Sequence, residues 1–278
     1  MFRGCTAISS VPTNLLPSMN VGRYSYLGMF RYCSSLTSVP DLPATGLELW
    51  GYEAMFQGCT SLTSVPTNLL SAITTYITTR GYKAMFMDCT NLRNAPNLPA
   101  SAVYIYGYEN MFQNCTSLKT PPELGTTSLN TSCYINMFNG CTSLSTAPNL
   151  PATGLAEKCY CSMFNGCTNL NNINVAFTNW TEADGATTNW VSGVQTNGGT
   201  FTKPFALSAE YGIHRIPTNW NVIDSDAPSE ALIFKAVNGS ATIGLSSVGN
   251  PYAGTFYYKL NDGSWVDWYQ DNITLQQG

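Results

Sequence analysis

Apolar residues recur in a fixed frame, Met-Phe-x-x-Cys-x-x-Leu, over roughly the first 175 residues of the chain. The clearest copy places Met55, Phe56, Cys59 and Leu62 in this frame, and Val65 follows three residues later. Seven copies begin at Met1, Met29, Met55, Met85, Met111, Met137 and Met163, so the steps are 28 (29−1), 26 (55−29), 30 (85−55) and then 26 three times. A period in the twenties is typical of a solenoid, in which each repeat packs on its neighbours.

The spacing within one repeat predicts a short helix followed by a short strand. Tyr52, Met55 and Phe56 stand at i, i+3 and i+4, which places them on one face of a helix. Gly58 comes next and tolerates the left-handed conformation that ends helices. Beyond it, Cys59 and Val65 bound a short extended segment. The position of Gly58 is occupied in the other repeats by Gly4, Tyr32, Asp88, Asn114, Gly140 and Gly166, of which only Tyr32 does not fit this prediction.

This frame resembles the BspA-like leucine-rich repeats of bacterial surface proteins, whose repeats carry a Phe-x-x-Cys-x-x-Leu core. The resemblance covers roughly residues 1–175, with Met before Phe where Ala is common in that family. It implies a fold class: an α/β repeat solenoid, leucine-rich-repeat-like and right-handed with parallel strands, followed here by a small all-β module. It also implies a cell-surface location, but no single ligand.

The frame divides the chain into three expected domains. Residues 1–175 form the leucine-rich-repeat solenoid, and residues 176–226 form a C-terminal cap in which Trp180, Trp190 and Trp220 cover the last repeat. An aromatic platform for sugars, built from the same tryptophans, is the alternative. Within the cap, residues 188–194 fit a short helix and residues 200–204 a strand that ends at a proline.

Residues 227–278 form the third expected domain, a small β-sandwich-like module whose last strand is missing or is supplied by a neighbour. Its expected strands cover residues 231–237, 241–245, 255–260 and 264–269, with a further short apolar stretch at 273–275. Asn261, Asp262 and Gly263 are a strong hairpin signal between two of these strands.

The apolar frame also predicts a core ladder, because equivalent positions of stacked repeats lie above one another. Neighbouring strands lie about 4.8 Å apart, whereas disulfides need Cβ separations of about 3.5–4.5 Å, so we expect buried free thiols. Cys133 and Cys159 precede the tyrosines of two repeats and form either a bridge or a second ladder. The main ladder consists of Phe30, Phe56, Phe86, Phe112, Phe138 and Phe164 with Cys33, Cys59, Cys89, Cys115, Cys141 and Cys167.

Composition narrows the function classes. Charged residues make up only 10% of the chain and the net charge is −4, without a run of basic residues. Nucleic-acid binding normally needs clustered Lys and Arg, so we expect no nucleic-acid partner. No apolar stretch reaches the roughly 20 residues of a membrane span. Because Met1 already belongs to a repeat, we expect the chain to be part of a longer polypeptide.

The sequence offers no convincing catalytic set, so we expect the protein not to be an enzyme. Nucleophilic catalysis needs a base beside the nucleophile, and the single histidine, His214, lies in the expected cap. The acids of the repeats occupy unrelated positions, which does not suit paired-carboxylate chemistry. Structural zinc sites contain cysteine pairs with the spacing C-x₂₋₄-C, which does not occur in this sequence. We therefore expect no cofactor and no metal.

What remains is a repeated polar surface between the buried positions of each predicted strand. In a stack these residues line up as a stripe of hydroxyl and amide groups, which either keeps the protein soluble or binds a protein or glycan partner. The sequence therefore predicts a recognition or adhesion module that is extracellular, on the cell surface or on a virion. The alternative is a structural spacer or stalk without its own ligand. The stripe comprises Ser38, Ser64, Asn94, Thr120 and Thr146.

Overall fold

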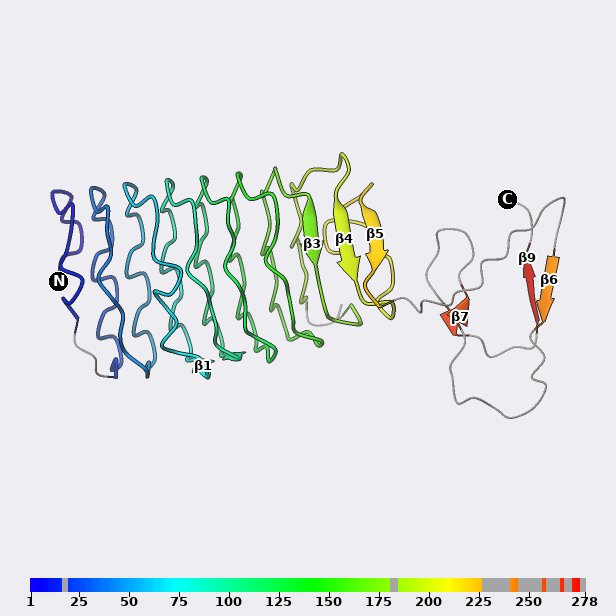
Figure 1. Ribbon diagram of the computed structural model, residues 1–278, viewed down its shortest axis with the longest axis horizontal. Coiled ribbons are helices and arrows are strands. Elements are labelled where there is room, and N and C mark those ends of the chain that lie inside the picture. The colour runs from blue at the N-terminus through cyan, green and yellow to red at the C-terminus, as the bar shows by residue number, and fades with distance from the viewer. Residues whose placement is uncertain are drawn as a thin grey trace.

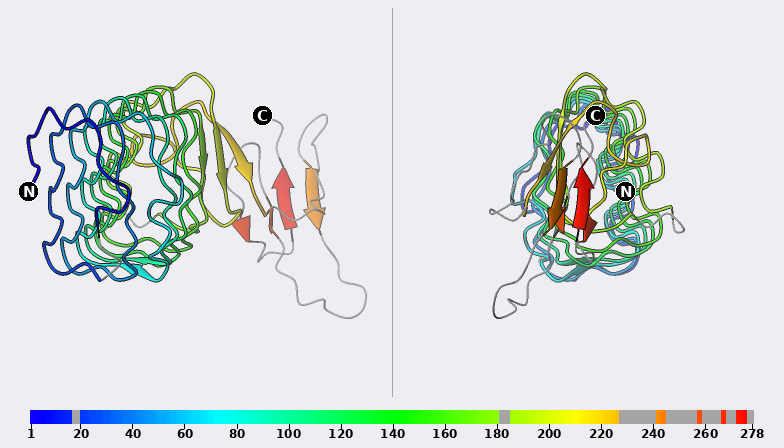
Figure 2. Two further views of the ribbon diagram at one scale, coloured as in Figure 1. Left: turned by 60° about the vertical axis from the view of Figure 1, so that its left-hand side comes forward. Right: turned by 90° about the vertical axis from the view of Figure 1, so that its right-hand side faces the viewer.

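The computed structural model describes residues 1–16, 20–180 and 185–226, together with the backbone of four short strands within residues 241–275. From the N-terminus to residue 226 the chain winds into successive coils that lie side by side (Figure 1). We use the word coil for the stretch from one repeat Met to the next. Seen from an oblique angle, the coils follow one another with nearly the same outline (Figure 2).

Two columns of aromatic rings run through the stack. The phenylalanines from Phe2 to Phe164 lie above one another with ring centroids 5.5–5.7 Å apart and planes within 15° of parallel. The tyrosines from Tyr26 to Tyr160 form the second column, at 5.3–5.9 Å. From Phe30 onwards every phenylalanine of the column is fully buried. Because no ring can be covered without its neighbours, each coil depends on the coils beside it.

The apolar segment of each coil is a series of turns, not a helix. The N–H groups of Met55 and Gln57 donate to the carbonyl groups three residues earlier, at 3.2 Å in both cases. The N–H group of Phe56, between them, donates to Met85 O of the next coil at 2.9 Å. Backbone N–H groups along this segment therefore donate alternately to a carbonyl of the same coil and to a carbonyl of the following coil. In an α-helix, by contrast, each N–H group donates to a carbonyl of the same helix.

Positive φ angles recur every fourth residue in this segment, at Trp50 (60°), Ala54 (55°) and Gly58 (72°). Each is the third residue of a hydrogen-bonded turn, where a type II turn requires positive φ. The position of Gly58 is left-handed in every repeat, including Tyr32 (φ 62°), which the sequence had marked as unsuitable. The left-handed residue was therefore predicted correctly, but it closes a turn and does not end a helix.

The α/β leucine-rich-repeat fold class expected from the sequence is wrong. The described residues contain no helix, and most coils have no strand of their own. The apolar spacing i, i+3, i+4 misled the prediction because a series of turns also directs those three positions to one side. Positive φ at every fourth residue then prevents a helix from continuing.

The strands before residue 227 are few, short and parallel. They are β1 (Tyr76–Ile77) paired with β2 (Ala102–Val103), and β3 (Asn172–Asn174), β4 (Thr200–Lys203) and β5 (Asn221–Asp224), which form one sheet in that order. Elsewhere the strand-like pairing between successive coils is limited, in the described residues, to isolated parallel bridges such as Asn94 with Thr120. Strand β4 confirms the strand predicted at residues 200–204, and β5 was not predicted.

The expected all-β module is not shown by the structure. Strands β6 (Ala241–Gly244) and β9 (Asn272–Leu275) pair antiparallel, and β7 (Tyr257–Tyr258) pairs antiparallel with β8 (Val266–Asp267), so the four strands form two separate two-stranded sheets. The register of β7 and β8 is centred on residue 262. The hairpin turn predicted at residues 261–263 and the strand predicted at 231–237 lie outside the described residues.

Beyond the seventh repeat the turns continue for one more coil, with positive φ at Gly185, Asn189 and Gly193. The short helix predicted at residues 188–194 is therefore wrong. Trp190 is fully buried in this coil, and its ring centroid lies 6.1 Å from that of Phe164. Trp220 is also buried, and its indole N–H donates to Gln195 O at 2.8 Å. An aromatic sugar platform needs exposed rings, so these two tryptophans do not form one.

All ten cysteines are free, and eight of them are buried. From Cys33 to Cys167 each thiol of the main ladder donates to the Phe carbonyl oxygen of the preceding coil, at 3.0–3.2 Å. Cys133 and Cys159 are buried free thiols as well, so no disulfide joins them. The ladder is thus a column of hydrogen-bonded thiols.

This arrangement predicts a sharp difference in thiol reactivity. In the native protein we expect only Cys5, which is exposed, and Cys161, which is half-buried, to react quickly with a thiol reagent. In denaturant all ten cysteines should react. Kinetic labelling followed by mass mapping counts the reactive cysteines in each state. Rapid labelling of Cys115 in the native protein would show that the reagent reaches the buried thiols, which would contradict the prediction.

Candidate functional site

The predicted stripe lies at equivalent places on successive coils. Ser38, Ser64, Thr120 and Thr146 are exposed, and Asn94 is half-buried. Isolated parallel bridges join Asn94 to Thr120 and Thr146 to Asn172 of the next coil, so these residues are direct neighbours. The structure thus brings the predicted residues together along one side of the stack.

Hydrogen bonding leaves most polar groups of the stripe available. The amide nitrogen of the Asn94 side chain donates to Val65 O at 2.8 Å, which fixes that side chain between two coils. Just before the stripe, the N–H of Arg93 donates to Thr63 O at 3.0 Å and the N–H of Lys119 donates to Arg93 O at 3.0 Å. The backbone beside the stripe is therefore held by hydrogen bonds between coils, while the residues that carry the hydroxyl groups are exposed to solvent.

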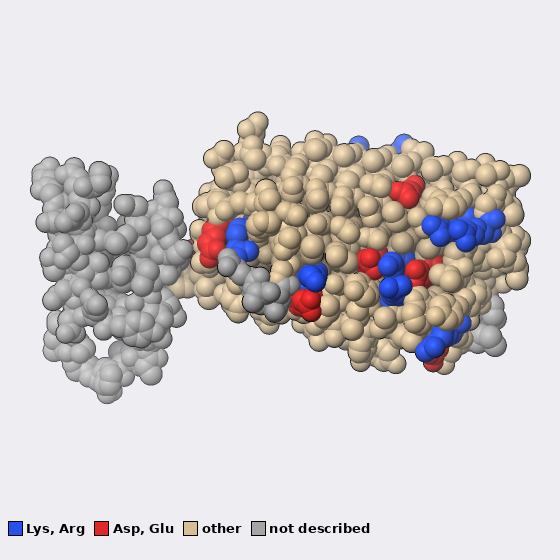
Figure 3. Space-filling view, turned by 180° about the vertical axis from the view of Figure 1, so that it is seen from behind, with Lys and Arg blue, Asp and Glu red and all other residues tan. Residues whose placement is uncertain are grey.

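On one face of the molecule the charges lie in small groups separated by wide uncharged areas; most of these groups contain both signs, and one is basic alone (Figure 3). Beside the stripe, Arg93 and Lys119 are exposed on neighbouring coils. Exposed Glu123 accepts from the side-chain amide of Asn97 at 3.4 Å. Positive and negative side chains thus lie within a few residues of one another. This surface therefore suits a polar partner better than a strongly charged one.

A second row of side chains, on the turns, combines aromatic rings and cations. Tyr24 stacks on Trp50 with ring centroids 4.7 Å apart, and Arg80 and Lys83 lie 5.4 and 5.7 Å from the ring centroid of Tyr106. Lys83 also pairs with Glu109 at 2.7 Å. These aromatic rings make their contacts with residues of the neighbouring coil. The row therefore stabilises the packing of successive coils through aromatic stacking and cation–π contacts.

The third feature is a hollow of about 640 Å³ near the end of the stack. It forms where the loop around residues 208–216 is fastened to the coil that follows the seventh repeat. The N–H of Asn189 donates to Nδ1 of His214 at 2.8 Å, and the indole N–H of Trp190 donates to Arg215 O at 2.7 Å. The hollow is lined by Gly185, Ala186, Thr187, Thr188, Glu210, Tyr211, Gly212, His214 and Arg215.

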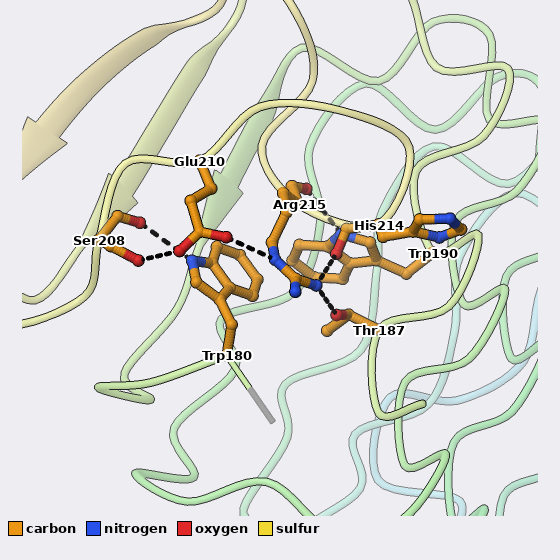
Figure 4. A network of polar contacts seen from close by, with 7 residues as sticks. All are labelled: Trp180, Thr187, Trp190, Ser208, Glu210, His214 and Arg215. Atoms are coloured by element: carbon orange, nitrogen blue, oxygen red, sulfur yellow. Dashed lines mark hydrogen bonds and ion pairs between the residues drawn. The ribbon is translucent and has the colours of Figure 1, made fainter. Parts of the chain in front are cut away.

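Arg215 is the centre of the polar network in this loop (Figure 4). Its Nε donates to Glu210 at 3.1 Å, one terminal nitrogen donates to Thr187 Oγ1 at 3.4 Å, and the guanidinium lies 5.1 Å from the ring centroid of Trp180. The hydroxyl of Ser208 and the guanidinium of Arg215 hold the pKa of Glu210 below its usual value. Glu210 is therefore a carboxylate at neutral pH, and its charge balances that of Arg215.

His214 has a defined role in the same loop. Since its Nδ1 accepts the Asn189 N–H, the proton of the neutral ring must be on Nε2. The ring is exposed, so Nε2 can donate a hydrogen bond outward. The sequence placed His214 in the expected cap without a catalytic role, and Tyr211, Glu210 and Arg215 were not singled out from the sequence. No local motif marks them, because the hollow is created by contacts between a loop and a coil about 25 residues apart.

Further findings concern metal sites, membrane-spanning helices and similar proteins. Among the described residues, no cluster of three or more His, Cys, Asp or Glu could hold a metal ion. The same part of the chain contains no helix of the length and apolarity that a membrane crossing needs. Comparisons with models of protein families, with curated proteins and with solved structures found no match.

Proposed function

We propose that the chain is a non-catalytic recognition or adhesion module, which binds a protein or glycan partner through the stripe formed by Ser38, Ser64, Asn94, Thr120 and Thr146. The observation that carries the proposal is the exposure of hydroxyl groups at one repeat position on coils held at a constant spacing. Extended repeat surfaces of this kind commonly serve as binding faces. A position on a bacterial cell surface or a phage particle belongs to the same proposal and rests on the repeat frame.

The absence of catalysis belongs to this proposal and is supported by the state of the ionisable groups. Nδ1 of His214 is occupied by a backbone N–H, so it cannot act as a base towards a neighbouring nucleophile. Glu109 is paired with Lys83. Burial raises the pKa of the ladder thiols, which keeps them protonated and unreactive.

One pair of substitutions tests the binding face. We expect Thr146→Arg, which places a long cation on the stripe, to lower partner binding at least tenfold. Thr153→Arg introduces the same side chain on the same repeat, at an exposed residue outside the stripe, and should leave binding unchanged. Exposed substitutions usually alter stability by no more than about 0.5 kcal/mol, so both variants should remain folded.

The measurement is a glycan array together with capture of surface proteins, followed by affinity determination for wild type and both variants. Loss of binding in Thr146→Arg alone supports the stripe. Equal losses in both variants, or no partner on any array, would contradict it. The second result would favour the structural spacer, which the continuous ring columns and inter-coil hydrogen bonds also suit.

A further inference from the structure

The hollow beside Tyr211 lies outside the stripe and has its own chemistry. Its lining residues include the paired Glu210 and Arg215, and also Thr187, Thr188 and His214. Hollows with a few convergent polar groups are the usual form of small-ligand sites. The backbone around this one is fixed, because the N–H groups of Asn189 and Val191 both donate to the facing loop.

The charges of the hollow favour a neutral ligand. The side chain of Arg215 is only 11% exposed, and its guanidinium pairs with Glu210 and lies over Trp180. An anionic ligand would compete with Glu210 for Arg215, and a cationic ligand would meet Arg215 beside the carboxylate. The side chain of Glu210 is 48% exposed, so the carboxylate can still accept hydrogen bonds from hydroxyl groups.

The lining of the hollow also contains hydrogen-bond donors and acceptors together with an aromatic residue. Nε2 of His214 can donate, the carboxylate of Glu210 can accept, and the hydroxyl of Thr188 can do both. Tyr211 is 52% exposed and lines the same hollow, so it offers an apolar surface beside these polar groups. A ligand that matches this arrangement has several hydroxyl groups and one apolar C–H face.

We infer that this hollow binds a neutral sugar residue. The apolar face of the sugar packs on the ring of Tyr211, and its hydroxyl groups donate to the carboxylate of the adjacent Glu210, whereas His214 lies on the other side of Arg215 (Figure 4). The site does not depend on the stripe: it lies on a different part of the chain, and either surface can fail its test while the other passes.

The test uses the full chain and a panel of methyl glycosides of glucose, galactose, mannose and N-acetylglucosamine. Glucuronate and glucosamine serve as the anionic and cationic members of the panel. Saturation-transfer-difference NMR detects binding, and calorimetric titration gives the affinity. A single sugar residue should bind with a dissociation constant near millimolar, as expected for one small contact surface. At least one neutral glycoside should bind more tightly than either charged sugar.

Variants assign the binding to the hollow. Tyr211→Ala should lower the affinity at least tenfold, whereas Tyr211→Phe should retain most of it, because the ring surface remains. The matched control is Ile213→Ala, which removes another exposed side chain of the same loop that does not line the hollow. Thr146→Arg on the stripe should also leave this binding unchanged.

Three results would overturn the inference. They are failure of every neutral glycoside to bind, preference for glucuronate or glucosamine, and undiminished binding by Tyr211→Ala. A preference for glucuronate would show that Arg215 is available to ligands. A thermal melt of each variant shows that it is folded, so a loss of affinity cannot be attributed to unfolding.

Discussion

Between about pH 8 and pH 10 we expect the free energy of unfolding to fall steeply, because eight buried thiols resist deprotonation in the folded chain. Burial raises the pKa of Cys59 and Cys167 to about 12 and that of Cys159 to about 11. Burial likewise raises the pKa of the other five buried thiols. They are Cys33, Cys89, Cys115, Cys133 and Cys141.

The sign follows from proton binding. An unfolded thiol loses its proton near pH 8.5, so above about that value the unfolded state holds fewer protons than the folded state. The contribution of each thiol to stability is therefore complete below the unfolded pKa and is lost as the pH rises towards the folded pKa. Each of the seven thiols other than Cys33 accounts for about 1.4 kcal/mol per pH unit. Together they account for about 10 kcal/mol per pH unit, which is comparable with the whole stability of a typical domain.

Denaturant melts at several pH values under reducing conditions measure this effect. A pair of single substitutions identifies its source. Cys115→Ala removes a buried thiol that donates to Phe86 O, and should reduce the slope of stability against pH above pH 9 by about 1.4 kcal/mol per pH unit. Cys5→Ala removes an exposed thiol and should leave the slope unchanged. A free energy of unfolding that stays constant up to about pH 10 would show that the thiols are not closed off from water.

The repeat frame was sufficient to predict which side chains point inward. Phe56 and Cys59 recur at constant spacing, and a repeated position in a stack must be either always inside or always outside. Their complete burial follows from that geometry. The left-handed position after each Phe was also predictable, because Gly, Asn and Asp tolerate positive φ better than other residues.

The backbone path between those side chains was not predictable in the same way. Ala54 and Ala84 adopt positive φ (55° and 53°), although alanine favours a right-handed helix. What holds them is the inter-coil bond that each N–H makes, at 2.8 Å, to Lys83 O and Glu109 O respectively. A single repeat contains no sign of this bond, so local propensity favours a helix and the stack imposes turns.

The hollow near residue 211 was missed for a related reason. Asn189 and His214 are 25 residues apart, and their hydrogen bond forms only after the loop has been placed against the coil. Glu210 and Arg215 belong to no motif or repeat position in the sequence. The stripe, by contrast, was found because it repeats. Sequence reasoning thus detects what is periodic and overlooks sites built from single residues.

We expect Phe86→Ala to destabilise the protein by about 3–5 kcal/mol, from lost burial and from the cavity left behind. Phe86 is fully buried, and its ring stacks between Phe56 at 5.5 Å and Phe112 at 5.6 Å. The cavity would therefore weaken the contacts of its coil with both neighbours. Because each coil relies on the next, thermal unfolding should separate into two steps, one for each side of the defect.

Ser64→Ala is the matched control, since Ser64 is exposed on the stripe of the neighbouring coil. It should change the free energy of unfolding by no more than about 0.5 kcal/mol, and the protein should still unfold in one step. Circular dichroism and calorimetry of both variants measure the size of the effect and the number of transitions. If Phe86→Ala proved as mild as Ser64→Ala, the ring column would not be the core, and the assignment of inward and outward positions would be wrong. The stripe would then lose its basis as a binding face, because its exposure follows from the same assignment.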